Sequence, residues 1–111
     1  MTDKQYCFCV NEAKNYTDRD AYISDMALSS IWGDASDDGV PAERMEQLGS
    51  VYDASNRSIK DIAAAAGMSN RKLAERFCIP YRTMENWCGG QRSCPDYVRL
   101  MMQECLDILK R

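Results

Sequence analysis

The chain has 111 residues, of which 45% are hydrophobic and 28% are charged. That length suffices for one compact core but hardly for two. No run of residues approaches the roughly 18 to 20 consecutive apolar positions that a membrane span needs, and the N-terminus lacks the basic-then-apolar pattern of a secretion signal. We therefore expect a soluble cytoplasmic protein that makes no contact with a membrane.

The formal net charge of −3 conceals a difference between the two halves of the chain. Residues 1–56 hold 11 acidic and 4 basic side chains, a net charge of −7, whereas residues 57–111 hold 6 acidic and 10 basic ones, a net charge of +4. A surface that binds nucleic acid needs cations, because neutralising phosphates supplies most of the non-specific affinity. Only the second half meets that requirement.

Six cysteines and the absence of histidine bear on metal and catalytic chemistry. The cysteines stand at positions 7, 9, 78, 88, 94 and 105 of a chain without a secretion signal, so we expect free thiols. They form no Cys-x-x-Cys pair, which argues against a zinc site. Without histidine or partnered carboxylates the chain lacks the usual groups for acid-base catalysis, and we expect neither an enzyme nor a bound cofactor.

Residues 1–39 are predicted to form an acidic N-terminal extension with one helix. Cys7 and Cys9 alternate with their neighbours, which favours an arm or a short strand at the N-terminus. Between Asp18, a candidate helix cap, and Gly33, apolar residues recur at helical spacing: Tyr22, Ile23, Met26, Ala27 and Ile31. A polar linker rich in aspartate and glycine completes the extension.

Residues 40–111 are predicted to form a second, helical domain. Pro41 suits the start of a helix whose apolar face carries Met45, Leu48, Val51 and Tyr52. Caps and breakers divide the remaining chain into four more helices: Ser58 and Ser69 as N-caps, Gly67 and Gly89-Gly90 as stops, and Pro80 and Pro95 before the last two. The final helix, from Asp96 to Lys110, has a wide apolar stripe that includes Tyr97, Met101 and Leu109.

Several residues between Ser58 and Arg99 stand at fixed offsets around two tight turns. They are Gly67-Met68-Ser69, Leu73-Ala74, Thr83-Met84, Trp87 and Gly90-Gln91-Arg92, with Pro95 close behind. In these offsets the segment resembles the lambda-repressor-like, or XRE-type, helix-turn-helix family. The resemblance implies an all-α, lambda-repressor-like helix-turn-helix bundle, to which the first 39 residues add a helical extension.

Three positions depart from the family's pattern. Cys78 stands where a turn glycine is usual, Pro80 stands at the usual Ser or Thr cap, and Cys88 replaces the customary glutamate. None of these changes destroys the turn, but Cys78 is expected to adopt a left-handed or otherwise adjusted backbone.

The resemblance also implies which residues would contact DNA. The third helix of the motif would enter the major groove with its N-terminus first, so that Tyr81, Arg82, Glu85 and Asn86 face base edges. Arg82 suits a bidentate contact to guanine, and Asn86 suits one to adenine. The residues expected to contact phosphates are Asn70, Arg71, Lys72, Gln91 and Arg92.

Two functions from different classes follow from these observations. The first is a sequence-specific DNA-binding protein, a small bacterial or mobile-element transcriptional regulator of the repressor type, which would bind double-stranded DNA as a homodimer. The alternative is a protein-interaction module, or an inhibitor of a host nucleic-acid-binding protein, that acts through its acidic N-terminal half. The dimer surface stays open between two apolar stripes, Tyr22 to Ile31 and Tyr97 to Leu109.

Overall fold

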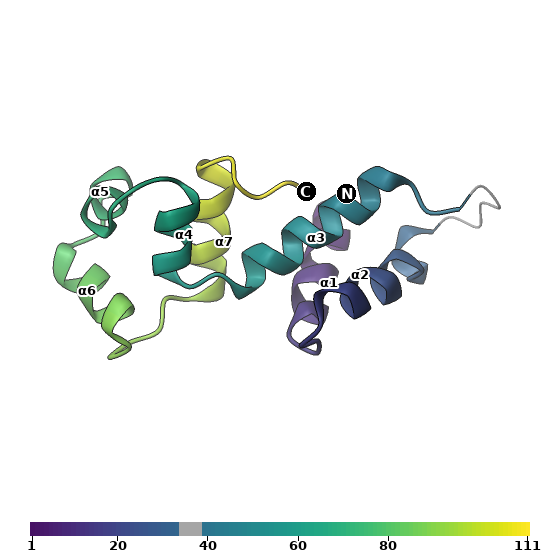
Figure 1. Cartoon of the computed structure of the whole chain (residues 1–111), viewed down its shortest axis with the longest axis horizontal. Coiled ribbons are helices and arrows are strands. Elements are labelled where there is room, and N and C mark those ends of the chain that lie inside the picture. The colour runs from purple at the N-terminus through teal and green to yellow at the C-terminus, as the bar shows by residue number, and fades with distance from the viewer. Residues whose placement is uncertain (34–38) are drawn as a thin grey trace. The chain divides into compact units, whose positions relative to one another are not determined.

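The structure, a computed structural model, describes residues 1–33 and 39–111. Every regular element of these residues is helical, which confirms the predicted all-α class. The elements in chain order are α1 (Asp3–Ala13), α2 (Arg19–Ala27), the 3₁₀ helix η1 (Ser30–Trp32), α3 (Ala42–Asn56), α4 (Ile59–Ala65), α5 (Asn70–Arg76), α6 (Tyr81–Gly89) and α7 (Asp96–Cys105) (Figure 1). None of the described helices is long and apolar enough to cross a membrane. Most of the predicted polar linker lies outside the described residues.

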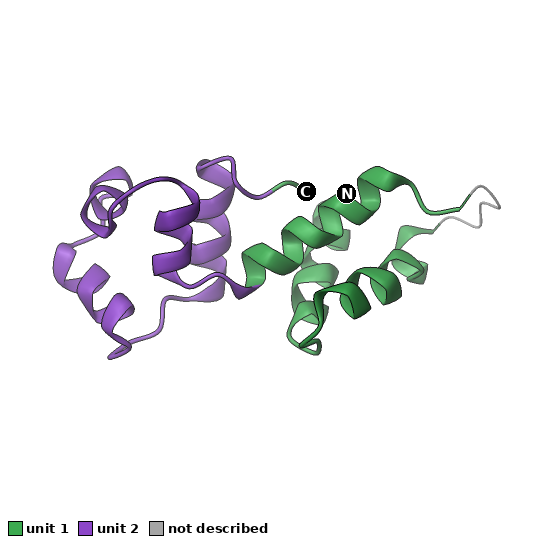
Figure 2. Cartoon of the chain, viewed as in Figure 1, with its two compact units in different colours: residues 1–55, 110–111 green, residues 56–109 purple. Residues whose placement is uncertain are grey.

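The chain forms two compact units, coloured separately in Figure 2. Unit 1 consists of residues 1–55 and 110–111, and unit 2 consists of residues 56–109. The chain thus has two compact units where its length predicted a single core, and the boundary lies after residue 55 instead of at the predicted residue 39. The difference arises because α3 packs with α1 and α2.

The core of unit 1 is built around Tyr22, which is fully buried. Its ring meets the ring of Tyr16 edge-on at 5.4 Å and that of Tyr52 at 5.0 Å, and its hydroxyl donates a hydrogen bond of 2.8 Å to the Cys9 carbonyl. Leu48, also fully buried, comes from α3. Three helices thus share one core.

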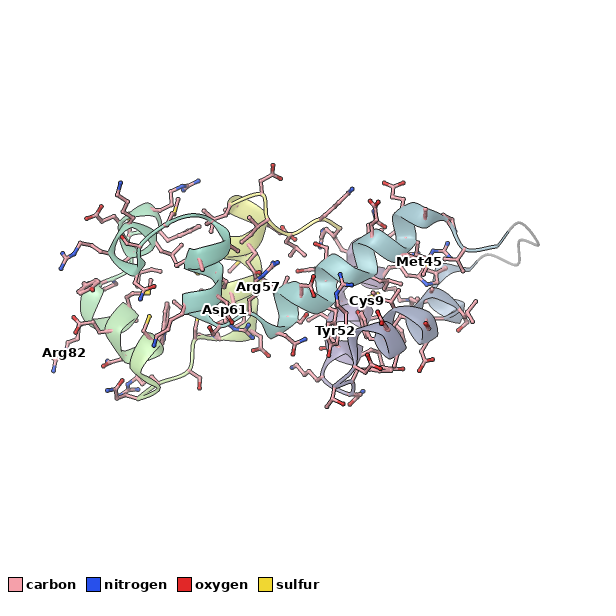
Figure 3. All side chains as sticks on the ribbon, in the orientation of Figure 1. Cys9, Met45, Tyr52, Arg57, Asp61 and Arg82 are labelled. Atoms are coloured by element: carbon pink, nitrogen blue, oxygen red, sulfur yellow. The ribbon has the colours of Figure 1, made fainter. Side chains whose placement is uncertain are left out.

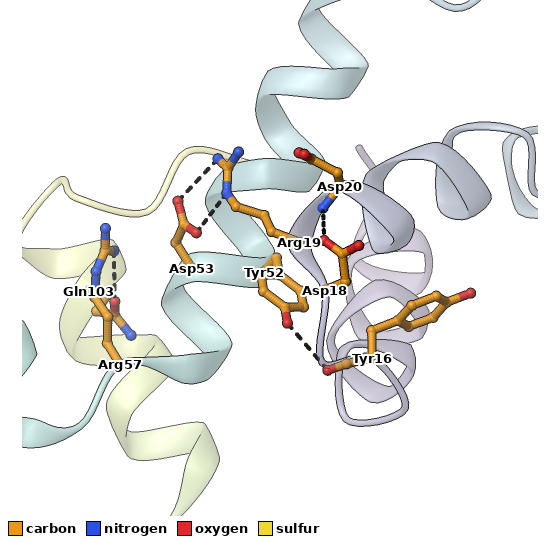
Figure 4. Close-up of polar contacts among 8 residues, drawn as sticks. All are labelled: Tyr16, Asp18, Arg19, Asp20, Tyr52, Asp53, Arg57 and Gln103. Carbon is orange, nitrogen blue, oxygen red and sulfur yellow. Dashed lines mark hydrogen bonds and ion pairs between the residues drawn. The ribbon is translucent and has the colours of Figure 1, made fainter.

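Polar contacts add to the packing of α3 in unit 1 (Figure 4). The Arg19 guanidinium donates two hydrogen bonds to the Asp53 carboxylate, at 2.9 and 3.2 Å, and the Tyr52 hydroxyl donates one to the Tyr16 carbonyl at 3.2 Å. Lys110 also belongs to this unit, since its amide donates to Ser50 Oγ at 2.8 Å and its ammonium lies 3.0 Å from Glu46.

The predicted N-terminal arm or strand is wrong, because these residues form α1. Thr2 caps the helix in a reciprocal capping box with Gln5, and Tyr6, Cys9 and Ala13 are its buried residues. Spacings of three and four residues are those of a helix. The alternation near Cys9 misled the prediction, since Cys7 is exposed.

Three other expectations need correction at element ends and faces. The helix predicted to run to Gly33 ends at Ala27 and is followed by η1. Met45, predicted on the apolar face of α3, is 43% exposed. The last helix ends at Cys105, before Asp107, whose φ of 59° is left-handed.

The core of unit 2 draws on all four of its helices. The buried residues are Ile59, Ile62 and Ala63 from α4, Leu73 and Ala74 from α5, Met84 from α6 and Met102 from α7. Gln103 is fully buried, accepts a 3.1 Å hydrogen bond from Arg57 (Figure 4) and donates one of 3.1 Å to the Arg99 carbonyl. Its polar atoms are thus partnered inside the unit, as burial requires.

Candidate nucleic-acid interface

Helices α5 and α6 are joined by a tight turn. Ser69 Oγ caps α5 by accepting a 3.1 Å hydrogen bond from the Lys72 amide. At the other end, Cys78 has a φ of 56°, as predicted, and the Ile79 amide donates to the Ala74 carbonyl at 2.9 Å. A left-handed residue and a backbone hydrogen bond back to the last turn are a common way to end a helix. They fix the direction in which the chain leaves α5.

Helix α6 begins at Tyr81, directly after Pro80, which provides no side-chain cap. Met84 is buried and Trp87 is half-buried against the core of unit 2, so one face of α6 is anchored. Gly90, with a φ of 81°, ends the helix. This conformation is easy for glycine, which is why the Gly89-Gly90 stop was predictable.

The outer face of α6 carries the residues predicted to contact bases. Arg82 and Glu85 are exposed, Tyr81 is 39% exposed, and Asn86 is half-buried. Arg82 is labelled in Figure 3, where it projects away from the ribbon of α6. Because positions three and four residues apart share a helix face, Arg82, Glu85 and Asn86 lie on one side of α6. The structure thus brings these three together.

The residues predicted to contact phosphates lie at two places in unit 2. Arg71 and Lys72 are exposed and Asn70 is half-buried on the first turn of α5. Gln91 and Arg92 are exposed just after α6. The Arg92 amide donates to the Asn86 carbonyl at 3.3 Å, which ties this loop back to the helix.

The segment from Asn70 to Arg92 is rich in exposed cations. It holds five basic residues, namely Arg71, Lys72, Arg76, Arg82 and Arg92, against two acidic ones, Glu75 and Glu85, a net charge of +3. All seven side chains are exposed. Unit 2 therefore carries its positive surplus on the segment that contains α5 and α6.

One contact in this region was not foreseen from the sequence. The Arg71 guanidinium lies over the ring of Tyr81, 4.4 Å from its centroid. The two residues are ten positions apart on different helices. No periodicity within one element could have revealed the contact, because it depends on how the turn brings the two helix starts together.

Many acidic side chains of unit 1 are engaged within that unit. Asp53 pairs with Arg19, Glu46 with Lys110 and Asp3 with Arg111, and Asp25 accepts a 2.9 Å hydrogen bond from the Tyr16 hydroxyl. Part of the excess of carboxylates in unit 1 is thus used in ion pairs and hydrogen bonds within that unit. A protein partner bound through the acidic N-terminal half would thus meet carboxylates that already have partners within unit 1.

The cysteines are free thiols, and no group of described residues has the composition and closeness that a metal ion would need. In unit 2, burial raises the pKa of the half-buried Cys94 thiol above its ordinary value. Cys94 is therefore a neutral packing residue beside the core.

A scan against protein-family models, a search of curated proteins and a search of solved structures found no match to this chain. The resemblance to the helix-turn-helix family thus depends on the motif residues themselves.

Proposed function

We propose that the protein is a sequence-specific double-stranded DNA-binding protein that reads the major groove with α6. The observation that carries the proposal is the tight α5–α6 turn, which leaves the outer face of α6 exposed beside a segment of net charge +3. A helix fits the major groove, and nearby cations bind the phosphates on either side of it. Both requirements of a DNA-reading surface are met by one short segment.

Arg82 and Asn86 are the residues proposed to determine sequence preference. A guanidinium can donate two hydrogen bonds to guanine, and a carboxamide can pair with the donor and acceptor of adenine. Arg82 has no hydrogen bond or ion pair with another described side chain, so its donors are available. Glu85 would accept from cytosine or repel phosphate, and Arg71, Lys72 and Arg92 would bind phosphates.

The proposed role is that of a small transcriptional regulator of the repressor type, in a bacterium or a mobile element, acting as a homodimer in the cytoplasm. One such module contacts few base pairs, and two half-sites one helical turn apart raise specificity. The Tyr22 to Ile31 stripe is mostly used inside unit 1, where Tyr22, Ile23, Met26 and Ala27 are buried. The exposed apolar face of α7 is the better candidate for the dimer surface.

Selection of bound fragments from a random pool of DNA duplexes tests the function. We expect a recurring motif, and binding to it should weaken on Arg82→Ala or Asn86→Ala by about 1 to 3 kcal/mol per lost base contact. Arg76→Ala is the matched control, because it removes an exposed cation from the end of α5 without touching the face of α6. A pool without enrichment would refute DNA reading, and an equal loss in all three variants would refute the base contacts.

A further inference from the structure

The stacked pair of Arg71 and Tyr81 joins the starts of two helices. Arg71 lies on the first turn of α5 and Tyr81 is the first residue of α6, and the guanidinium carbon is 4.4 Å from the ring centroid. A guanidinium that stacks on an aromatic face keeps its plane fixed while its N–H edge stays open. The guanidinium of Arg71 thus lies against a residue of the neighbouring helix, which restricts the positions it can take.

Neither side chain has another partner among the described residues. Arg71 makes no hydrogen bond or ion pair there, so its donors are unused, and the hydroxyl of Tyr81 makes no hydrogen bond there either. Tyr81 is 39% exposed. Among the described residues, the cation that lies over its ring is Arg71.

The neighbouring cations differ from Arg71 in this respect. Arg76 lies 5.2 Å from the ring of Phe77, the next residue in the chain, so that contact joins no two helices. Lys72 is not among the described cations that lie over an aromatic ring. Of these three cations on α5, Arg71 is the one whose direction depends on α6.

We propose that Tyr81 is a positioning residue that holds the Arg71 guanidinium ready for one phosphate of the DNA backbone. This inference rests on the proposed function and changes the part that Tyr81 plays in it, from base contact to phosphate binding. A planar guanidinium binds phosphate through two parallel hydrogen bonds, so its plane matters. Restricting the long side chain before binding also lowers the entropy lost on binding.

The test measures affinity over a salt series for two duplexes, the selected site and a scrambled sequence of the same length. Tyr81→Leu removes the ring and should weaken binding to both duplexes by about two- to fivefold, the value of an exposed cation–π contact. Tyr81→Phe keeps the ring and should bind like the original protein. Arg71→Gln should lower by about one the slope of log affinity against log salt concentration. Adding Tyr81→Leu to Arg71→Gln should not weaken binding any further.

Other binding results would contradict the role proposed for Tyr81. A loss confined to the selected duplex would show that Tyr81 contacts a base, and an equal loss in Tyr81→Phe would show that its hydroxyl contacts the DNA directly. Either result would overturn the inference. The inference would also be overturned if Tyr81→Leu weakened binding in the Arg71→Gln variant as much as it does in the original protein. If the original protein binds neither duplex, the proposed function itself fails. This failure is seen without any variant, so it is distinct from a failure of the inference about Tyr81. Thermal unfolding of each variant checks that it is folded.

Discussion

The turn between α5 and α6 depends on the backbone of a single residue, Cys78. Its φ of 56° lies in the left-handed region, which a residue with a Cβ enters at a cost of about 1 to 2 kcal/mol. The side chain is exposed and lies outside the buried core, so little packing compensates for this cost. The energy to hold this conformation must come from the helices on either side, through the buried Leu73, Ala74 and Met84.

We predict that Cys78→Gly stabilises unit 2 by about 0.5 to 1 kcal/mol. Glycine removes the left-handed strain, and its greater freedom in the unfolded chain cancels part of the gain. Cys78→Ala is the control, because it removes the thiol but keeps the Cβ and should give no comparable gain. Urea titrations in a Trp32→Phe background, followed by the fluorescence of Trp87, measure the free energy of unfolding of unit 2. Equal stabilisation by both substitutions would show that the thiol, not the backbone angle, is responsible.

At the scale of elements, the helices of unit 2 were predictable because their ends are marked locally. Ser58 forms a capping box with Asp61, Ser69 caps α5, and Gly67 and Gly90 take positive φ values after α4 and α6. Each signal acts within a few residues, so it can be read from the sequence.

The grouping of helices into units was not predictable in the same way. α3 belongs to unit 1 because of contacts with distant residues, such as Arg19 with Asp53 and Tyr22 with Tyr52. α1 was missed although Tyr6, Cys9 and Ala13 carry the helical spacing, because a short alternation at Cys7 and Cys9 suggested a strand. For the candidate site, helical spacing and the family pattern placed the outer face of α6, but the stacking of Arg71 on Tyr81 is tertiary.

The exposed face of α7 leads to a prediction about self-association. Tyr97 and Met101, four residues apart on that face, are 66% and 55% exposed. Met101 also lines an apolar hollow of about 210 Å³, together with Phe77, Ile79, Val98, Met102 and Cys105. We expect Met101→Glu to shift the proposed homodimer to monomer, since it would place a charge in the buried part of the proposed interface. Sedimentation measurements over a range of concentrations report the change.

Leu28→Glu is the matched control for this experiment. Leu28 is 79% exposed, more than Met101, and it follows α2 in unit 1. If general hydrophobicity caused association, the two substitutions would act alike. An original protein that is monomeric at all concentrations, or a Leu28→Glu variant that dissociates as readily as Met101→Glu, would contradict a dimer through α7.

At the scale of the whole molecule, the two units have separate cores and different titratable groups. In unit 1, burial raises the pKa of the Cys9 thiol from 9.0 to about 11, and burial with the neighbouring Cys9 raises the pKa of the Tyr22 phenol well above its ordinary value. A group whose pKa is raised by folding contributes stability that is complete below its unfolded pKa and is lost as the pH rises toward its folded pKa. Alkaline pH should therefore lower the free energy of unfolding of unit 1.

Each unit contains one of the two tryptophans, which allows this weakening to be followed separately. Trp32 lies in η1 of unit 1 and Trp87 in α6 of unit 2. In a Trp87→Phe variant we expect the free energy of unfolding reported by Trp32 to fall between about pH 8 and about pH 11, with roughly 2 to 3 kcal/mol of the loss due to Cys9. Cys9→Ala in the same background lacks the titrating thiol, so its stability should fall less steeply with pH, whatever its stability at neutral pH. Urea titrations under reducing conditions measure both slopes, and identical slopes would show that burial of Cys9 is not what makes unit 1 sensitive to alkali.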